Sequence, residues 1–107
     1  MVKIVRITVD PSKLDEYKKI LNEEIEASLR LEKDVRVLYA AWDNENPNQF
    51  TILEVYKDQK AYDEHCASPQ LQKYFAETKD MVRHIEAMDA TPLIDLSLIH
   101  ISEPTRP

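Results

Sequence analysis

Apolar side chains recur along this chain with two different periods, which predict four strands and three helices. Alternation at every second residue is typical of strands and covers residues 2–9, and further strands are expected over residues 35–42 and 49–56. Spacings of three or four residues are typical of amphipathic helices, and they begin at Leu14 and again at Leu71. The first helix is expected to reach about residue 31, and a last strand is expected over residues 85–94.

Capping residues and breaks indicate where the helices begin. Ser12 with Asp15 three residues later resembles a capping box at the start of the first helix. Asp58 is expected to cap a short helix that runs through Ala67, and Pro69 to begin the next helix. The buried stripe predicted for that helix is Leu71, Tyr74, Phe75, Thr78, Met81, Val82 and Ile85.

The predicted order β-α-β-β-α-β is that of an α+β, ferredoxin-like fold with an antiparallel sheet. The second and third strands are apolar on both faces, whereas a sheet covered on one side should be polar on the other. In the second strand, the pattern places Val35, Val37, Tyr39 and Ala41 opposite Leu38, Ala40 and Trp42. A second copy of the same sheet could cover the free face, so we expect a homodimer through the sheet face.

Composition excludes several classes of protein. The 107 residues are enough for one domain, and the net charge of −6 without a basic run argues against nucleic-acid binding. The longest apolar run, residues 37–42, is too short to cross a membrane, and the single Cys66 suits a reducing cytoplasm. The absence of glycine excludes Gly-rich phosphate loops and predicts positive-φ turns at the Asn and Asp residues of segment 43–48.

The end of the chain is unlike the end of a domain. Residues 96–106 match, without a gap, the translation of a transposase mosaic-end adapter used in sequencing libraries. We therefore expect a domain over residues 1–94, followed by a non-native, adapter-derived tail over residues 95–107. Genomic DNA that encodes the same tail across this junction would refute this interpretation.

Two side chains on neighbouring predicted elements are the candidates for catalysis. Glu54 lies within an apolar strand, where an unpaired carboxylate is costly, and His65 lies on the short helix that follows. A histidine can act as a general base near neutral pH. Alternatively, Glu54 could be a structural carboxylate in an ion pair, and His65 a structural histidine held by hydrogen bonds. The aromatic candidates for the wall of a substrate pocket, which could equally be plain core, are Tyr39, Trp42, Phe50, Tyr56 and Tyr74.

The remaining polar candidates have simpler interpretations. Cys66 is expected to be a small buried residue, and His84 to end a helix. Neither residue forms a metal-binding spacing with His65, so no metal site is predicted. Glu24 is assigned, with the other charged residues of the first helix, to a solvated outer face.

Residues 2–94 resemble the antibiotic biosynthesis monooxygenase family, small dimeric α+β barrels that are often assigned to quinol oxidation. The resemblance is carried by an ordered set of segments: 23–28, 31–32, 38–40, 45–47, 51–56, 61–62, His65, 68–69 and 89–94. Two departures stand out: Lys33-Asp34 replaces a Pro-Gly pair, and Gln70 stands where the family commonly has a second histidine. The related heme-degrading branch has a Trp and a His at the positions where this chain has His65 and Phe75, so the resemblance disfavours heme degradation.

The resemblance implies a monooxygenase without a cofactor that oxidises a small electron-rich phenol or quinol with dioxygen. His65 would then be the base, and Glu54 its partner or the acceptor of a substrate hydroxyl. One alternative is an isomerase of a small phosphorylated hydroxy-dione, which would need a cationic phosphate clamp. Another is a non-catalytic dimeric module that binds small molecules or acts in stress.

Overall fold

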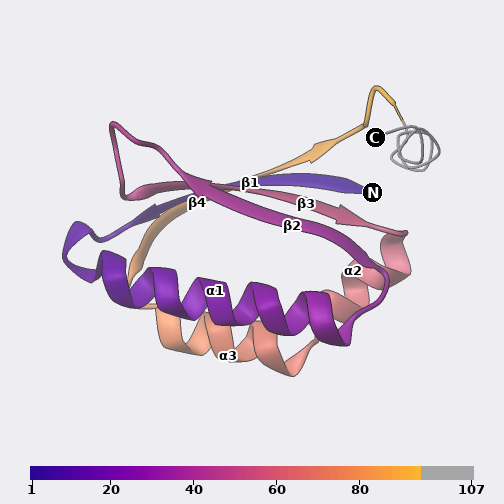
Figure 1. The fold of residues 1–107 in the computed structure, drawn as a ribbon, viewed down its shortest axis with the longest axis horizontal. Coiled ribbons are helices and arrows are strands. Elements are labelled where there is room, and N and C mark those ends of the chain that lie inside the picture. Colours follow the sequence, from indigo (N-terminus) through magenta and orange to yellow (C-terminus); the bar gives the residue numbers. More distant parts are fainter. Residues whose placement is uncertain (95–107) are drawn as a thin grey trace, which may run out of the picture.

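The computed structural model describes residues 1–94, so the predicted tail lies outside the described residues. Four strands form one antiparallel sheet in the order β2-β3-β1-β4, and the helices lie together on one of its faces (Figure 1). This is the ferredoxin-like α+β fold predicted from the sequence. The elements are β1 (Val2–Val9), η1 (Pro11–Lys13), α1 (Leu14–Leu31), β2 (Val35–Trp42), β3 (Gln49–Tyr56), α2 (Gln59–Cys66), α3 (Pro69–Thr78) and β4 (Val82–Ala90).

The start of the first helical segment differs from the prediction by two residues. The side chain of Asp10, rather than that of Ser12, caps it by accepting a hydrogen bond from the backbone N–H of Ser12 at 3.0 Å. Pro11 then occupies the first position of the single turn η1, which leads into α1. The predicted pair of Ser12 and Asp15 is therefore not the cap, because an acid one residue before the proline supplies the acceptor first.

The predicted third helix was too long. Ser68 caps α3 and Pro69 begins it, but the helix ends at Thr78 and β4 begins at Val82. Met81 is buried in the turn between them, so its apolar spacing continued the helical pattern beyond the helix. His84, which was predicted at a helix end, is an exposed residue of β4 with its Nε2 3.1 Å from the Oε1 of Glu86.

The hydrophobic core lies between the sheet and the helices. Tyr17 of α1 is fully buried and packs edge-on against Phe50 of β3 and Tyr74 of α3. The hydroxyls of Tyr17 and Tyr74 share a buried hydrogen bond, and burial raises the pKa of Tyr17 far above its usual value. The bond satisfies two polar groups that would be costly to bury alone.

The other face of the sheet carries no helix of the described chain (Figure 1). Tyr39 of β2 lies opposite Leu53 of β3 on this face, and both are exposed, Tyr39 to 71%. A bulge between Val35 and Val37 shifts the alternation of β2, so Val35 packs with Leu38 under the helices instead of sharing a face with Tyr39. The predicted face of Val35 was therefore wrong, whereas exposed apolar residues on the free face agree with the pattern.

The loop between β2 and β3 has a conformation that the sequence did not predict. No residue among 1–94 has a positive φ, so the Asn and Asp residues of this loop do not use the left-handed region. Instead, the carboxylate of Asp43 accepts a hydrogen bond from the backbone N–H of Glu45, and the N–H of Gln49 bonds to the carbonyl of Asn46. Within residues 1–94, no helix has the length and apolar character needed to cross a membrane.

Candidate active site

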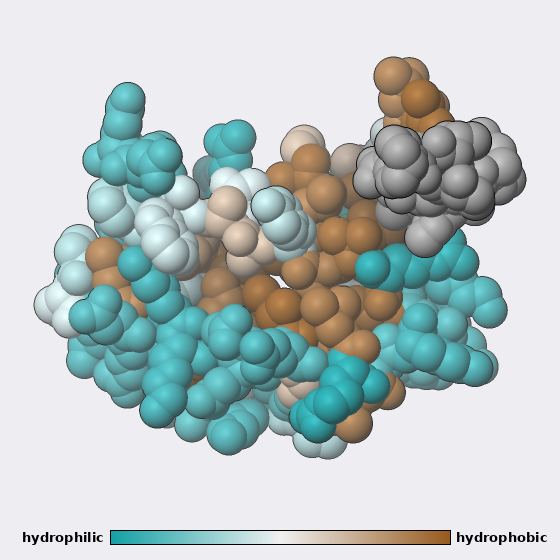
Figure 2. Space-filling model, in the orientation of Figure 1, coloured by the Kyte–Doolittle hydropathy of each residue, from teal (hydrophilic) through white to brown (hydrophobic). Residues whose placement is uncertain are grey.

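A cavity of about 280 Å³ lies between the sheet and the helices. Figure 2 shows apolar side chains gathered between the layer of the sheet and the layer of α1. Most of the wall is apolar, and a few polar side chains reach into it. The lining residues are Lys3, Val5, Ile7, Leu21, Glu24, Ile25, Leu38, Ile52, Glu54, Tyr56, Tyr62, His65, Cys66, Leu71, Tyr74, Phe75, Ile85 and Ala87.

His65 is placed in this cavity by the last turn of α2. The carboxylate of Asp58 caps the start of that helix, accepting from the backbone N–H of Ala61 at 2.9 Å. At the other end, the hydroxyl of Ser68 donates to the carbonyl of His65 at 2.7 Å. The imidazole that is held in this way is only 4% exposed.

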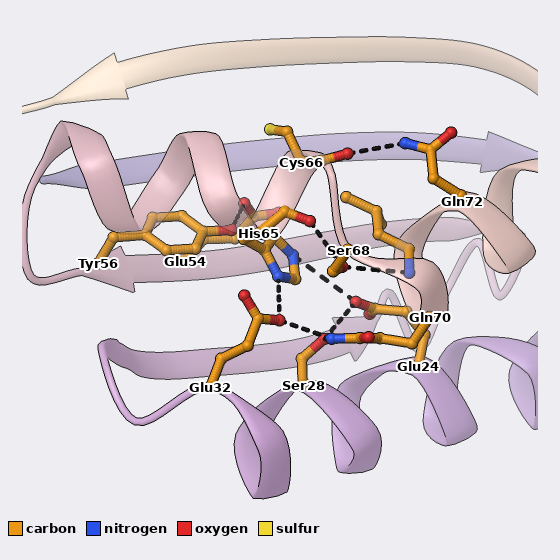
Figure 3. A network of polar contacts seen from close by, with 11 residues as sticks. Glu24, Ser28, Glu32, Glu54, Tyr56, His65, Cys66, Ser68, Gln70 and Gln72 are labelled. Carbon is orange, nitrogen blue, oxygen red and sulfur yellow. Dashed lines mark hydrogen bonds and ion pairs between the residues drawn. The ribbon is translucent and has the colours of Figure 1, made fainter.

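Glu24 of α1 and Glu32, which directly follows α1, contact the two nitrogens of His65 through their carboxyl groups (Figure 3). Nδ1 lies 2.9 Å from Oε2 of Glu32, and Nε2 lies 3.6 Å from Oε1 of Glu24. A carboxylate at hydrogen-bond distance holds a proton on Nδ1, which leaves Nε2 as the nitrogen that can accept one. The ring is thus oriented as a base toward the cavity and Glu24.

Ser28 and Gln70 complete the polar network around the imidazole (Figure 3). The hydroxyl of Ser28 donates to Oε1 of Glu24 at 2.9 Å. The side-chain amide of Gln70 donates both to Ser28 Oγ, at 3.1 Å, and to Glu32 Oε2, at 2.6 Å. Gln70 therefore holds Ser28 and the carboxylate of Glu32 in place through hydrogen bonds.

Glu24 is not on the solvated face of α1 to which the sequence assigned it. Its side chain is only 7% exposed, because α1 turns residues 24 and 28 toward α2 and α3. Burial raises the pKa of Glu24, and the nearby carboxylates of Glu54 and Glu32 raise it further. The hydrogen bond from Ser28 and the charge of His65 act in the opposite direction but do not cancel the effect of burial.

Glu54 reaches the same cavity from the sheet. It lies on β3 between Ile52 and Tyr56, on the face that the helices cover. The hydroxyl of Tyr56 donates to Oε1 of Glu54 at 2.7 Å, and burial together with this carboxylate raises the pKa of Tyr56. The ring centre of Tyr56 lies 5.4 Å from that of His65, so Tyr56 contacts both candidate catalytic groups.

The five aromatic candidates divide between this cavity and other places. Tyr56 and Tyr74 line the cavity. Phe50 is buried in the core, and Tyr39 lies on the free face of the sheet. Trp42 is half-exposed under the Nζ of Lys18, at 3.8 Å from the ring centre. It lines, together with Tyr39 and Phe50, a separate groove beside β2.

Several lining residues were not predicted to belong to a site. Phe75 and Ile85, assigned to a buried helical stripe, are about half exposed and border the cavity instead. Glu24, Ser28 and Glu32 are spaced four residues apart, which places them on one face of a helix. A repeated acid-hydroxyl-acid spacing beside an apolar stripe was the signal in the sequence that could have revealed them.

Basic and metal-binding groups complete the description of the cavity. Apart from His65, the one basic side chain in the described wall is Lys3, which pairs with Asp89 and lies 4.5 Å from the ring centre of Tyr62. Residues 1–94 contain no group of three or more His, Cys, Asp or Glu side chains placed to hold a metal ion.

The sequence matches the profile of a known protein family. The sequence profile of the antibiotic biosynthesis monooxygenases matches residues 1–77. The chain belongs to this family. The fold and the family are thus those indicated by the resemblance in the sequence.

Solved structures of this family are similar along most of the chain. A protein of Bacteroides thetaiotaomicron, provisionally named an antibiotic biosynthesis monooxygenase, is 53% identical, with 88% of this chain and 90% of that chain covered and a TM-score of 0.86. A provisionally named family member from Nitrosomonas europaea is 20% identical, with 87% and 98% covered and a TM-score of 0.82. The second similarity shows the fold alone. No curated protein matches the chain.

Proposed function

We propose that this family member is a monooxygenase without a cofactor that oxidises a small electron-rich phenol or quinol with dioxygen. The observation that supports it best is the buried His65, whose Nδ1 is held by Glu32 and whose Nε2 is directed away from that bond. An oriented imidazole in a largely apolar cavity is suited to remove a proton from a bound hydroxyl group. We also propose that the protein acts in the reducing cytoplasm, as its single Cys66 suggests.

Removal of a proton is the step that the protein needs to supply. His65 Nε2 takes the phenolic proton, and the resulting phenolate is electron-rich enough to pass an electron to dioxygen. Carbon–oxygen bond formation then places one oxygen atom on the ring, and the other leaves as water. The four electrons come from the substrate: two from hydroxylation of a ring C–H and two from oxidation of the quinol to the quinone. No external reductant is required.

Glu54 and the aromatic wall would position the substrate. A second hydroxyl group of a quinol can donate to the free oxygen of Glu54, whose Oε1 already accepts from Tyr56. Tyr74 and Phe75 provide flat apolar surface beside this point. A quinol that spans His65 and Glu54 would thereby have one hydroxyl at each polar group.

The phosphorylated-dione isomerase has less support from the cavity. A phosphate clamp needs cationic donors, and the described wall offers Lys3, which is already paired with Asp89. Glu24 and Glu54 face the same space and would repel a dianion.

Oxygen consumption in the presence of a panel of quinols and catechols tests the proposal. We expect His65→Gln to lower kcat by about 100-fold or more, the usual contribution of a general base. His84→Gln is the matched control, because His84 is an exposed histidine on β4. The proposed role of His65 is refuted if the two variants retain equal activity. Absence of turnover and of ligand-induced thermal stabilisation across the panel would favour a non-catalytic module.

We further propose that the free face of the sheet is the interface of a homodimer, as in the dimeric barrels that the family resemblance implies. Tyr39, Leu53 and Met88 leave apolar surface exposed there. In light scattering coupled to size exclusion, we expect a dimer that Leu53→Glu dissociates. Leu29→Glu, on an exposed position of α1, should leave it intact. A stable wild-type monomer at micromolar concentration would refute the interface.

A further inference from the structure

We propose that Glu24 carries the proton from His65 to solvent through a groove on the helix side of the molecule. The proposal rests on the function suggested above, because it concerns the proton that His65 would take from substrate. It gives Glu24 a role in proton release, whereas His65 and Glu54 are the residues proposed to contact the substrate directly.

The first observation is the position of Glu24 between two hollows. A groove of about 350 Å³ lies between α1 and α3, and its wall includes Arg30, Gln70 and Lys73. Glu24 and Tyr74 line both this groove and the cavity that contains His65. Among the described residues, these two side chains therefore form the boundary between the apolar cavity and the outer helix surface.

Of these two residues, Glu24 is the one suited to exchange a proton. The hydroxyl of Tyr74 is bonded to that of Tyr17, and burial raises the pKa of Tyr74, which keeps its proton in place. Among residues 1–94, the one hydrogen-bond donor to the carboxyl of Glu24 is Ser28, and this carboxyl lies 3.6 Å from His65 Nε2. A small rotation of the side chain, or one bridging water, completes a path across that distance.

Groups around Glu24 favour each of its two protonation states, which suits a side chain that takes up a proton and then releases it. Glu32, directly after α1, and Glu54 on β3 favour its neutral form, whereas His65 on α2, when charged, favours its carboxylate. Ser28 and, through Ser28, Gln70 on α3 stabilise the carboxylate by hydrogen bonding. The imidazolium can therefore return its Nε2 proton to Glu24, after which the carboxylic acid releases it to water in the groove.

The path also separates proton release from substrate binding. A quinol bound between His65 and Glu54 fills the cavity, so a proton that left through the cavity would have to pass the substrate. Release through the groove avoids this conflict, and His65 is restored as a base while the product is still bound.

The test uses exchange of the His65 ring proton with water, which requires no substrate. Nitrogen-15 NMR at a pH that protonates the imidazole would measure the exchange rate of the Nε2 proton. Glu24→Gln keeps the volume and an acceptor for Ser28 but cannot take up a proton. We expect this variant to slow exchange by at least fivefold. Glu16→Gln, on an exposed position of α1 that lines neither the groove nor the cavity, should leave the rate unchanged.

A second variant tests the groove without altering Glu24. Ala27 lines the groove but not the cavity, so Ala27→Phe should narrow the path and slow the same exchange. Equal exchange rates in the wild type and in a folded Glu24→Gln or Ala27→Phe variant would overturn the proposal. Slow exchange in the variants together with no quinol turnover would instead support the proton path and refute the oxidation.

Discussion

The buried carboxyl of Glu24 should leave a measurable mark on the stability of the protein. Its pKa is raised in the folded state, chiefly by burial, so the folded chain binds this proton more tightly than the unfolded chain does. The free energy of unfolding must then decrease as the pH rises from the ordinary glutamate range, near 4.5, to the raised value. Below that window the carboxyl is neutral in both states, and above it the full cost of burying the charge is present.

Glu24→Gln removes this titration while keeping the shape of the side chain. Each unit by which the pKa of Glu24 is raised corresponds to about 1.4 kcal/mol, so we expect the variant to gain that amount per unit of the shift, relative to wild type, as the pH passes through the window. The gain should be absent at low pH and constant at high pH. The hydrogen bond from Ser28 survives in the variant, because the amide oxygen can accept it.

Urea unfolding monitored by circular dichroism from pH 3.5 to pH 8 would measure the difference between the two curves. Glu23→Gln serves as the control, because Glu23 is exposed and should show almost no such difference. A difference between Glu24→Gln and wild type that stays constant across the whole range would refute the reasoning. It would mean that Glu24 titrates alike in the folded and unfolded chains.

Three further predictions concern the groups that hold the site together. Asp58→Ala removes the cap of α2 and should lower the free energy of unfolding by about 1 kcal/mol in urea titrations. Tyr17→Phe leaves the hydroxyl of Tyr74 buried without its partner and should cost about 1–3 kcal/mol, whereas adding Tyr74→Phe should cost little more, as a double-mutant cycle would show. Gln70→Glu places a carboxylate against Glu32 and should lower the melting temperature at neutral pH but less at acidic pH, as calorimetry would detect.

The fold could be predicted from the sequence because the signals for its strands and helices are local and repeated. The strands expected over residues 35–42 and 49–56 matched β2 and β3, and Asp58 and Pro69 marked the starts of α2 and α3 as predicted. The end of α3 was missed because Met81 continues a helical spacing although it packs from a turn. A pattern of apolar residues shows which side chains are buried, but it does not show whether the backbone between them is helical.

The residues of the candidate site were harder to predict from the sequence. Glu54 was identified because a carboxylate stands out in an apolar strand, and His65 because a histidine can act as a general base near neutral pH. Glu24 lies on a helix rich in charged residues and Glu32 directly follows it, so neither acid stands out in the sequence. Their burial depends on α2 and α3 covering one side of α1, which is a tertiary relation that no local pattern contains.

The backbone of the described chain, in which no residue has a positive φ, has a consequence for how a ligand would enter. Loops that open and close often turn about flexible glycine positions on microsecond to millisecond timescales, and this chain contains no glycine. The half-exposed side chains of Phe75 and Ile85 border the cavity, and side-chain rotations are completed within nanoseconds. We therefore expect admission of small molecules to be controlled by rotation of these two side chains, so that access is fast and depends on the size of the side chain at each position.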